Sequence, residues 1–373
     1  MRTRRYLFLA AISVVIGLFV VFAVAEVVLR FLPVQTGLRA LSVSDQNPVM
    51  RFTPDRAYVF SRGWNFTVVN RGQVNNYGFV NDQSYEPAAT APLLAIIGDS
   101  FIEAVMVPYA ETVQGRLASS VGNRGRVYSF ASSGSPLSQY LVYAQYARDT
   151  FRPQGMVFLV IGNDFDESLL KYKSAPGFHY FREEMGRLEL ARVDYAPSWT
   201  RQIARESALV RYVMTNMYLI EAAAAVVGER KSKNPSVPQY VGNVPARTTP
   251  ERIEDSKRAI RAFFDELPKR SGLDNRRIIF VLDGMRPSLY TEKGLKAAEG
   301  SYFDQMRRFF LQEAHDRDYE AIDMQPRFIS RHRVDGSLFE FATDGHWNGL
   351  GHGVAAEALS QTRMFQRIFP RQN

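Results

Sequence analysis

Short apolar runs alternate with helical patterns over most of this 373-residue chain, and this alternation limits its fold more than any other feature. Four of the five runs carry no charged residue. Such runs are typical of strands that are buried on both faces of a parallel sheet. We therefore expect an α/β fold of three layers, α/β/α, with helices on both faces of the sheet. The expected strands are residues 92–97, 127–130, 156–161, 278–282 and, with a weaker pattern, 319–323.

Helical patterns lie between and after these runs. The clearest begins at Thr249, a plausible N-cap residue, and Pro250 then takes the first helical position. Its apolar residues recur on one face, as in a helix that covers a sheet. The other expected helices are residues 112–120, 137–150 and 354–368.

The N-terminus carries a run of 20 residues, from Tyr6 to Ala25, without a charge. As a helix this run is about 30 Å long, which matches the hydrocarbon core of a bilayer. Apolar residues prolong the pattern, so we interpret 6–32 as a transmembrane anchor and 1–5 as a cytoplasmic tail. The tail holds Arg2, Arg4 and Arg5, and the positive-inside rule then exports the remaining chain. The prediction is a single-pass inner-membrane or cell-membrane protein whose main domain is periplasmic or extracellular.

A cleaved signal peptide is the alternative interpretation of this run. Ala23, Val24 and Ala25 precede Glu26 in an A-x-A pattern that suits signal peptidase. The apolar run is longer than a usual signal-peptide core, and this length favours the uncleaved anchor.

Composition excludes several functions. The chain has no cysteine, which excludes a disulfide framework, a thiol nucleophile and a cysteine zinc site. Its net charge of +8 is scattered rather than gathered into a stripe, so nucleic acid is not an expected partner and a membrane or acidic glycan suits it better. His179, His315 and His332 have no partners at metal-ligand spacing, and we expect no metal and no cofactor.

Two segments break the regular alternation. Residues 33–90 are rich in Asn, Gly and aromatic residues, and short runs such as 64–69 predict strands and turns there. Residues 91–373 form the expected main domain. Within it, the interval 166–249 contains no clear strand and one helical stretch, 208–227, so we interpret it as a helical insertion or cap.

Polar clusters follow the first three strands of the main domain, at the points where the strands end. Because the carboxyl ends of parallel strands meet at one edge of a sheet, these clusters are expected to converge there. A fourth cluster near the C-terminus adds an acid and a histidine. Together they supply a hydroxyl, a base and N–H donors, the parts needed for acyl transfer. The clusters are residues 98–100, 132–135, 162–164 and 344–348.

These motifs resemble the SGNH/GDSL hydrolases over residues 93–352. Gly98-Asp99-Ser100 matches the family's first block, and the resemblance makes Ser100 the nucleophile. Gly134 has the spacing of the oxyanion-hole glycine, and Asn163 in Gly-Asn-Asp matches the side-chain donor. The family's last block supplies the triad acid and base, matched here by Asp344 and His346, with one residue fewer between them than usual.

The resemblance implies an SGNH-type three-layer fold and a serine esterase or O-acyltransferase. Its oxyanion hole comprises the N–H groups of Ser100 and Gly134 and the Asn163 side chain. The short Asp344–His346 spacing and the following Trp347 resemble the membrane-linked branch tied to exopolysaccharide O-acetylation. That branch implies acetyl esters of an extracellular or cell-envelope polysaccharide as substrate, and a polysaccharide-export or acetylation machinery as partner.

Several alternatives remain open at this point. His352 is the rival base, since the shortened spacing leaves the orientation of Asp344 toward the His346 ring unsettled. A lipid esterase or lysophospholipase would use the same triad, and a catalytically degenerate scaffold of an export complex would keep only the fold. Asp99 and Asp164 are interpreted as structural. The Gly-x-Ser-x-Gly motif of α/β-hydrolases is absent around Ser100.

Overall fold

The computed structural model describes residues 2–217, 248–342 and 344–370, and they form two compact units. The larger unit contains residues 39–56 and 72–196 and the described residues after 248. The smaller unit contains residues 2–38, 57–71 and 197–217. Parts of the segment predicted as 33–90 therefore pack in each unit.

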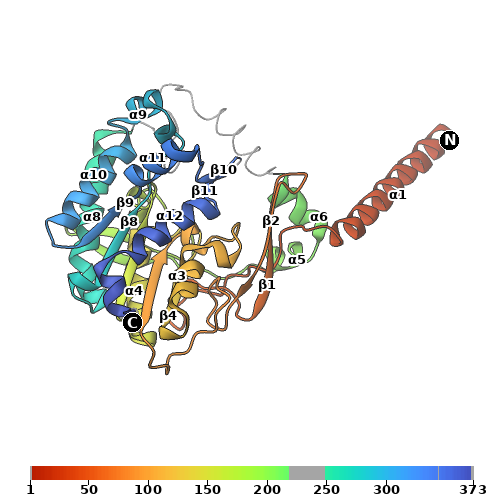
Figure 1. Cartoon of the computed structure of the whole chain (residues 1–373). Coiled ribbons are helices and arrows are strands. Elements are labelled where there is room, and N and C mark those ends of the chain that lie inside the picture. The colour runs from red at the N-terminus through yellow and green to blue at the C-terminus, as the bar shows by residue number, and fades with distance from the viewer. Residues whose placement is uncertain (1, 218–247, 343, 371–373) are drawn as a thin grey trace. The chain divides into compact units, whose positions relative to one another are not determined.

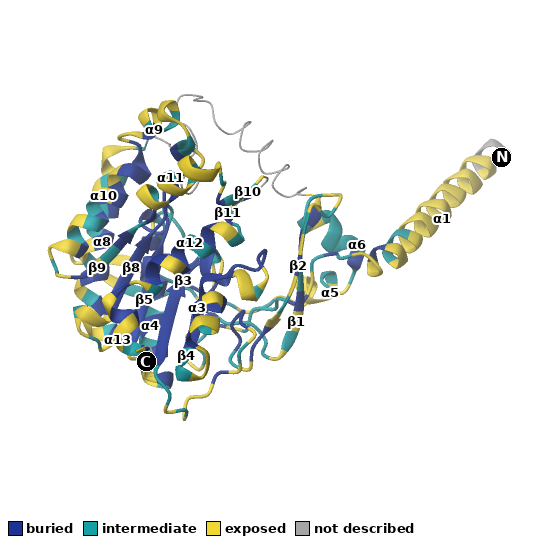
Figure 2. Cartoon of the chain, viewed as in Figure 1, coloured by how far each residue is buried: buried dark blue, intermediate teal, exposed yellow. Residues whose placement is uncertain are grey.

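A five-stranded sheet forms the centre of the larger unit (Figure 1). All neighbouring strands are parallel, which confirms the α/β class and the parallel sheet predicted from the alternating runs. The three central strands, β3, β5 and β8, are buried along their whole length (Figure 2), because helices cover both of their faces. In sheet order the strands are β4 (Arg126–Ala131), β3 (Leu93–Gly98), β5 (Gly155–Val160), β8 (Ile278–Leu282) and β9 (Glu320–Asp323).

Alternate residues of each strand enter two separate hydrophobic cores, as the two-residue period of a strand requires. Leu93, Ala95 and Ile97 pack under one helical layer, whereas Leu94 and Ile96 pack under the other. The first layer contains α4 (Leu137–Phe151), α8 (Pro250–Ser271) and α10 (Tyr302–His315). The second contains α2 (Ser100–Glu103), α3 (Val113–Val121), α11 (Met324–Asp335), α12 (Gly349–Ser360) and α13 (Arg363–Ile368). A short helix, α9 (Glu292–Ala298), precedes α10.

Side-chain caps set several helix boundaries. Thr249 accepts a hydrogen bond from the Arg252 N–H at 3.3 Å and begins α8, as predicted. The helix predicted over 354–368 is instead two helices. Asn348 caps the first one, which starts earlier than expected, and Thr362 caps the second. The apolar pattern alone predicted one continuous helix, whereas the capping residues begin two separate helices.

The insertion predicted as helical holds a β-hairpin, so that interpretation was wrong for this part. β6 (His179–Glu184) pairs antiparallel with β7 (Arg187–Arg192) across Met185 and Gly186, which both have positive φ. Half of the twelve residues in the two strands are Arg or Glu, so neither strand forms an apolar run that the sequence could reveal. Of the stretch predicted over 208–227, the structure describes α6 (Ala208–Arg211) and a π-helical turn at 212–216, and the remainder lies outside the described residues.

The smaller unit contains the N-terminal helix α1 (Arg2–Arg30), which includes the one helix segment among the described residues that is long and apolar enough to span a membrane. The unit also contains α5 (Trp199–Ala204) and α6, and most of the two-stranded sheet of β1 (Arg56–Arg62) and β2 (Val68–Val74). The strand predicted over 64–69 begins only at Val68. Phe66 has a φ of +57°, and the Asn65 side chain accepts a bond from the Thr67 hydroxyl, so the preceding residues form the turn.

Candidate active site

Ser100 lies directly after β3, where the chain turns sharply from strand to helix. Asp99 is the N-cap of α2, and its Oδ1 accepts a hydrogen bond from the Phe101 N–H at 2.9 Å. The other Asp99 oxygen lies 3.0 Å from the Ser100 Oγ. Burial raises the pKa of the Asp99 carboxyl. The capping role agrees with the structural interpretation of Asp99, and the turn places the Ser100 hydroxyl at the carboxyl edge of the sheet.

His346 lies against this hydroxyl, although 246 positions separate the two residues. Its Nε2 is 2.8 Å from the Ser100 Oγ, and its Nδ1 is hydrogen-bonded to the Asp344 carboxylate. Asp344 Oδ1 also accepts from the backbone N–H of His346 at 3.0 Å. The Asp344 side chain is only 4% exposed, against 26% for His346. Ser100, His346 and Asp344 thus form a continuous hydrogen-bonded chain.

The short spacing between the acid and the histidine has a simple geometric basis. Asp344 and His346 belong to a short strand, β11 (Asp344–Trp347), which pairs with β10 (Glu340–Phe341). Residues i and i+2 of a strand point to the same side, so the carboxylate reaches the ring across one intervening residue. The spacing that left the orientation of Asp344 open is therefore compatible with a triad.

Two residues that the sequence analysis missed hold β11 in place. Asp283 accepts a hydrogen bond from the indole N–H of Trp347 at 2.8 Å, and Arg286 donates to the Gly345 carbonyl at 3.0 Å. Arg286 and Asp283 also form a buried ion pair at 2.5 Å. Asp283 directly follows β8, so the rule that selected polar residues after strands could have found it.

The two further predicted donors follow the strands on either side of β3. Gly134 comes three residues after β4 and has a φ of +81°, a conformation that favours glycine. Among the described residues, no backbone carbonyl accepts a hydrogen bond from its N–H. Asn163 comes three residues after β5. Since connections leave β3 and β5 toward opposite edges of the sheet, both donors and Ser100 lie at its switch point, the usual place for a ligand.

His352, the rival base, lies elsewhere. Its ring is buried, its Nδ1 accepts from the Val113 N–H at 3.3 Å, and it packs edge-on against Trp347. Burial, with Arg116, His346 and Arg286 nearby, lowers its pKa to about 3. A neutral packing histidine fits these contacts. Asp164 is also buried and accepts from the Tyr140 hydroxyl and the Ile161 N–H, each at 2.8 Å, in agreement with a structural role.

No group of three or more His, Asp or Glu residues in the described ranges could hold a metal ion. His179 contacts Gln139 and His332 contacts the Ser337 carbonyl, while the side chain of His315 is 84% exposed.

Glu103, also missed in the sequence, is a fully buried carboxyl at the end of α2. It accepts hydrogen bonds from the Ser133 N–H at 3.1 Å and from the Ser133 hydroxyl. Burial raises its pKa to about 7, although the bonds from Ser133 act in the opposite direction. Glu103 therefore holds the residue just before Gly134.

This carboxyl predicts a pH-dependent stability. A pKa raised from 4.5 to about 7 on folding means that the native state binds the proton more tightly, so the stabilisation is complete below pH 4.5 and is lost as the pH rises through 7. We expect it to reach about 3 kcal/mol. Urea unfolding at pH 4.5, 6 and 7.5 gives the free energy of unfolding of the wild type and of Glu103→Gln. The change with pH in the difference between these two free energies measures the contribution of Glu103. A difference that is constant with pH would contradict the assignment.

Comparisons with known proteins give a distant structural likeness. The chain matches no protein-family profile and no curated protein sequence. Among solved structures, it is similar to a lipolytic G-D-S-L family protein from Veillonella parvula DSM 2008, with 10% identity, a TM-score of 0.35, and coverage of 73% of this chain and 98% of the other. It is also similar to a lipase/acylhydrolase from Enterococcus faecalis, with 9% identity, a TM-score of 0.39, and coverage of 76% of this chain and 100% of the other.

A two-domain esterase active on acetylated mannans is also similar, with 9% identity and a TM-score of 0.37, and coverage of 75% of this chain and 50% of that protein. At such identities and scores, the function has to be argued from the site itself.

Proposed function

We propose that this protein is a serine-dependent ester hydrolase or O-acyltransferase whose triad is Ser100, His346 and Asp344. The observation that carries the proposal is the hydrogen-bonded chain from the Ser100 Oγ through both ring nitrogens of His346 to the Asp344 carboxylate. A hydroxyl is a weak nucleophile until a base accepts its proton, and this arrangement supplies the base and the group that orients it.

In the proposed reaction, the Ser100 Oγ attacks the acyl carbonyl carbon while its proton passes to the His346 Nε2. The N–H groups of Ser100 and Gly134 and the Asn163 side chain stabilise the resulting oxyanion. Collapse of this intermediate breaks the bond to the leaving alkoxide, which takes the proton from Nε2. Water or a sugar hydroxyl, deprotonated by His346, then attacks the acyl-enzyme and restores Ser100.

For the substrate we propose acetyl esters of an extracellular or cell-envelope polysaccharide. The support is the resemblance of Asp344-Gly345-His346-Trp347 to the membrane-linked branch of the SGNH/GDSL hydrolases, together with the apolar helix α1. A polysaccharide-export or acetylation machinery is the partner that this substrate implies.

Acyl-chain preference and acceptor use test this substrate. The full-length chain in detergent is offered p-nitrophenyl acetate, butyrate and octanoate, with and without acetyl-free oligosaccharides. We expect acetate to be turned over fastest, and acetylated oligosaccharide to be found by mass spectrometry if transfer competes with hydrolysis. A preference for octanoate would instead favour a lipid esterase.

We further propose that α1 is retained as a single-pass membrane anchor with the larger unit outside the cytoplasm. Leu18, Phe19 and Val20 are 52–72% exposed on successive sides of the helix, an all-round apolar surface that suits lipid. Glu26 accepts hydrogen bonds from the backbone N–H groups of Ala208 and Leu209, at 3.0 and 2.9 Å. The last turn of the helix is therefore built into the smaller unit.

Retention of this helix predicts the mass of the mature protein. We expect the purified wild-type chain to keep residues 1–25 and to resist extraction from membranes by carbonate. The control is Ala25→Phe, which places a bulky residue where signal peptidase needs a small one, and it should change neither result. A wild-type protein that starts at Glu26, with Ala25→Phe restoring the longer chain, would refute the anchor.

A further inference from the structure

An ion pair links the two predicted donors that flank Ser100. The Asn163 Nδ2 donates to the Glu167 Oε2 at 3.0 Å, and the same oxygen accepts from the Lys173 Nζ at 2.5 Å. The Lys173 Nζ also donates to the Gly134 carbonyl at 2.9 Å. Residues from the ends of β4 and β5 are thus joined through Glu167 and Lys173, neither of which belongs to the proposed triad.

These contacts fix the orientation of the Asn163 amide. A carboxylate only accepts hydrogen bonds, so Glu167 holds the NH₂ end of the amide rather than its oxygen. One N–H of that group donates to Glu167, and we expect the second to bind the oxyanion. Without Glu167, either end of the amide could face the site.

The same network fixes the backbone around Gly134. Glu103 binds the Ser133 N–H, and Lys173 binds the Gly134 carbonyl, so the peptide groups on both sides of the Gly134 N–H are each held by a side chain. Glycine at a φ of +81° has little conformational preference of its own, so these bonds, together with the turn bond from the Ser135 N–H to the Ser132 carbonyl at 3.1 Å, define its orientation.

The segment that carries Lys173 is itself well supported. The Lys173 N–H donates to the Leu169 carbonyl at 3.1 Å, and the Leu170 N–H donates to the Phe181 carbonyl in β6 at 2.9 Å. The side chains of Lys173 and Glu167 are 21% and 27% exposed, so their pairing is partly shielded from water. The insertion therefore contributes directly to the edge of the site.

We propose that the Lys173–Glu167 ion pair positions the oxyanion hole, with Lys173 orienting the Gly134 peptide and Glu167 orienting the Asn163 amide. This inference rests on the proposed function. Both are positioning residues, because they act on the donors and contact no reacting atom. Misplaced donors weaken binding of the oxyanion in the transition state and leave binding of the uncharged ester almost unchanged.

The test is Lys173→Met, which keeps the length of the side chain and removes its charge and its hydrogen bonds. We expect kcat for acetyl-ester hydrolysis to fall on the order of 10- to 100-fold, less than for outright loss of a donor, with KM changed by less than about twofold. Lys173→Arg, which retains a charged donor, should recover most of the lost kcat. Inactivation by a fluorophosphonate, which also uses the oxyanion hole, should slow in parallel.

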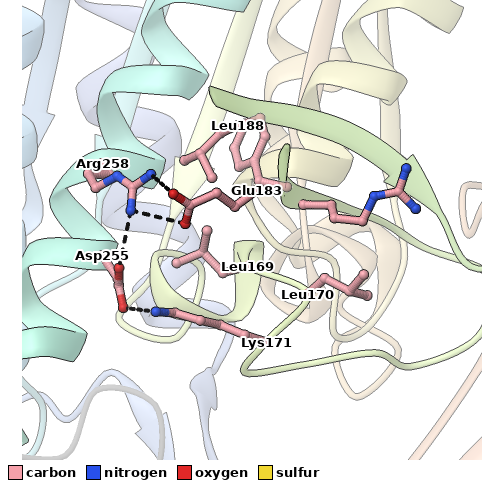
Figure 3. A pocket seen from close by; sticks show the side chains of 9 residues that line it. Leu169, Leu170, Lys171, Glu183, Leu188, Asp255 and Arg258 are labelled. Atoms are coloured by element: carbon pink, nitrogen blue, oxygen red, sulfur yellow. Dashed lines mark hydrogen bonds and ion pairs between the residues drawn. The ribbon is translucent and has the colours of Figure 1, made fainter. Parts of the chain in front are cut away.

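Lys171→Met is the matched control. Lys171 lies two residues away and pairs with Asp255 and Glu251 instead, beside a cavity of about 270 Å³ between the hairpin and α8 (Figure 3). None of the nine residues that line this cavity belongs to the triad or to the predicted donors. We therefore expect Lys171→Met to keep wild-type kcat and KM.

The outcomes separate this inference from the proposed function. A wild type that neither hydrolyses esters nor reacts with a fluorophosphonate would overturn the function. An active wild type whose kcat is unchanged in Lys173→Met, or falls equally in Lys171→Met, would overturn the positioning role alone. If Lys173→Met fails to fold, Glu167→Gln decides: a lower kcat at constant KM supports the proposal, and a wild-type kcat overturns it.

Discussion

Ser100→Ala is expected to lower kcat for acetyl-ester hydrolysis by a factor on the order of 10³ or more, because the hydroxyl it removes is the one that lies 2.8 Å from the His346 Nε2. Any residual rate would come from water activated beside the remaining donors. The folded state should persist, since the substitution removes a single oxygen atom, which lies 3.0 Å from Asp99 and 2.8 Å from His346. Steady-state kinetics of the full-length wild type and Ser100→Ala in detergent measures the loss of kcat. Circular dichroism of the two proteins checks that the fold is retained.

Ser120→Ala is the control for this prediction. Ser120 is an exposed serine of α3 whose hydroxyl donates to the Leu117 carbonyl at 2.8 Å, so loss of this hydroxyl should leave kcat at the wild-type value. A Ser100→Ala protein that retains more than about a tenth of the wild-type kcat would exclude Ser100 as the nucleophile.

Asp344→Asn is expected to lower kcat for acetyl-ester hydrolysis on the order of 10³- to 10⁴-fold. The Asp344 carboxylate accepts from both the Nδ1 and the backbone N–H of His346, which keeps the Nε2 free to receive the Ser100 proton. An asparagine amide in the same place can donate to Nδ1 and select the wrong tautomer of the ring. KM should change little, because the Asp344 carboxylate is buried against the His346 Nδ1 and is only 4% exposed.

Asp335→Asn is the matched control for that substitution. Asp335 ends α11 and pairs with Arg331 on the surface at 2.7 Å, so its loss should leave kcat unchanged. Equal kinetics of Asp344→Asn and the wild type would remove Asp344 from the triad and leave a Ser–His pair as the working site.

The central strands of the sheet could be predicted from the sequence because each of them is buried on both faces. Such strands must be apolar throughout. Each end of the runs predicted at 92–97, 156–161 and 278–282 lies within one residue of the observed strand end. The hairpin of β6 and β7 has no such requirement. Half of its strand residues are Arg or Glu, and in β6 the three charged residues are consecutive, so no apolar run marks the hairpin in the sequence.

Strand ends located the polar clusters that contain Ser100, Gly134 and Asn163, and the family resemblance assigned their roles. The structure brings Ser100, His346 and Asp344 into one hydrogen-bonded chain, and the roles of Gly134 and Asn163 stay predictions. The supporting residues were missed for a physical reason. Glu103, Glu167 and Lys173 meet the site through side chains from a helix and a loop, and only tertiary packing decides where those side chains point.

Covalent labelling tests the central claim most directly. The full-length chain is treated with a fluorophosphonate probe, and the modified residue is located by peptide mass spectrometry. The proposed triad predicts a single adduct on Ser100 that is lost in Ser100→Ala and forms far more slowly in His346→Gln. An adduct on another residue, or none in a folded wild-type protein, would contradict it.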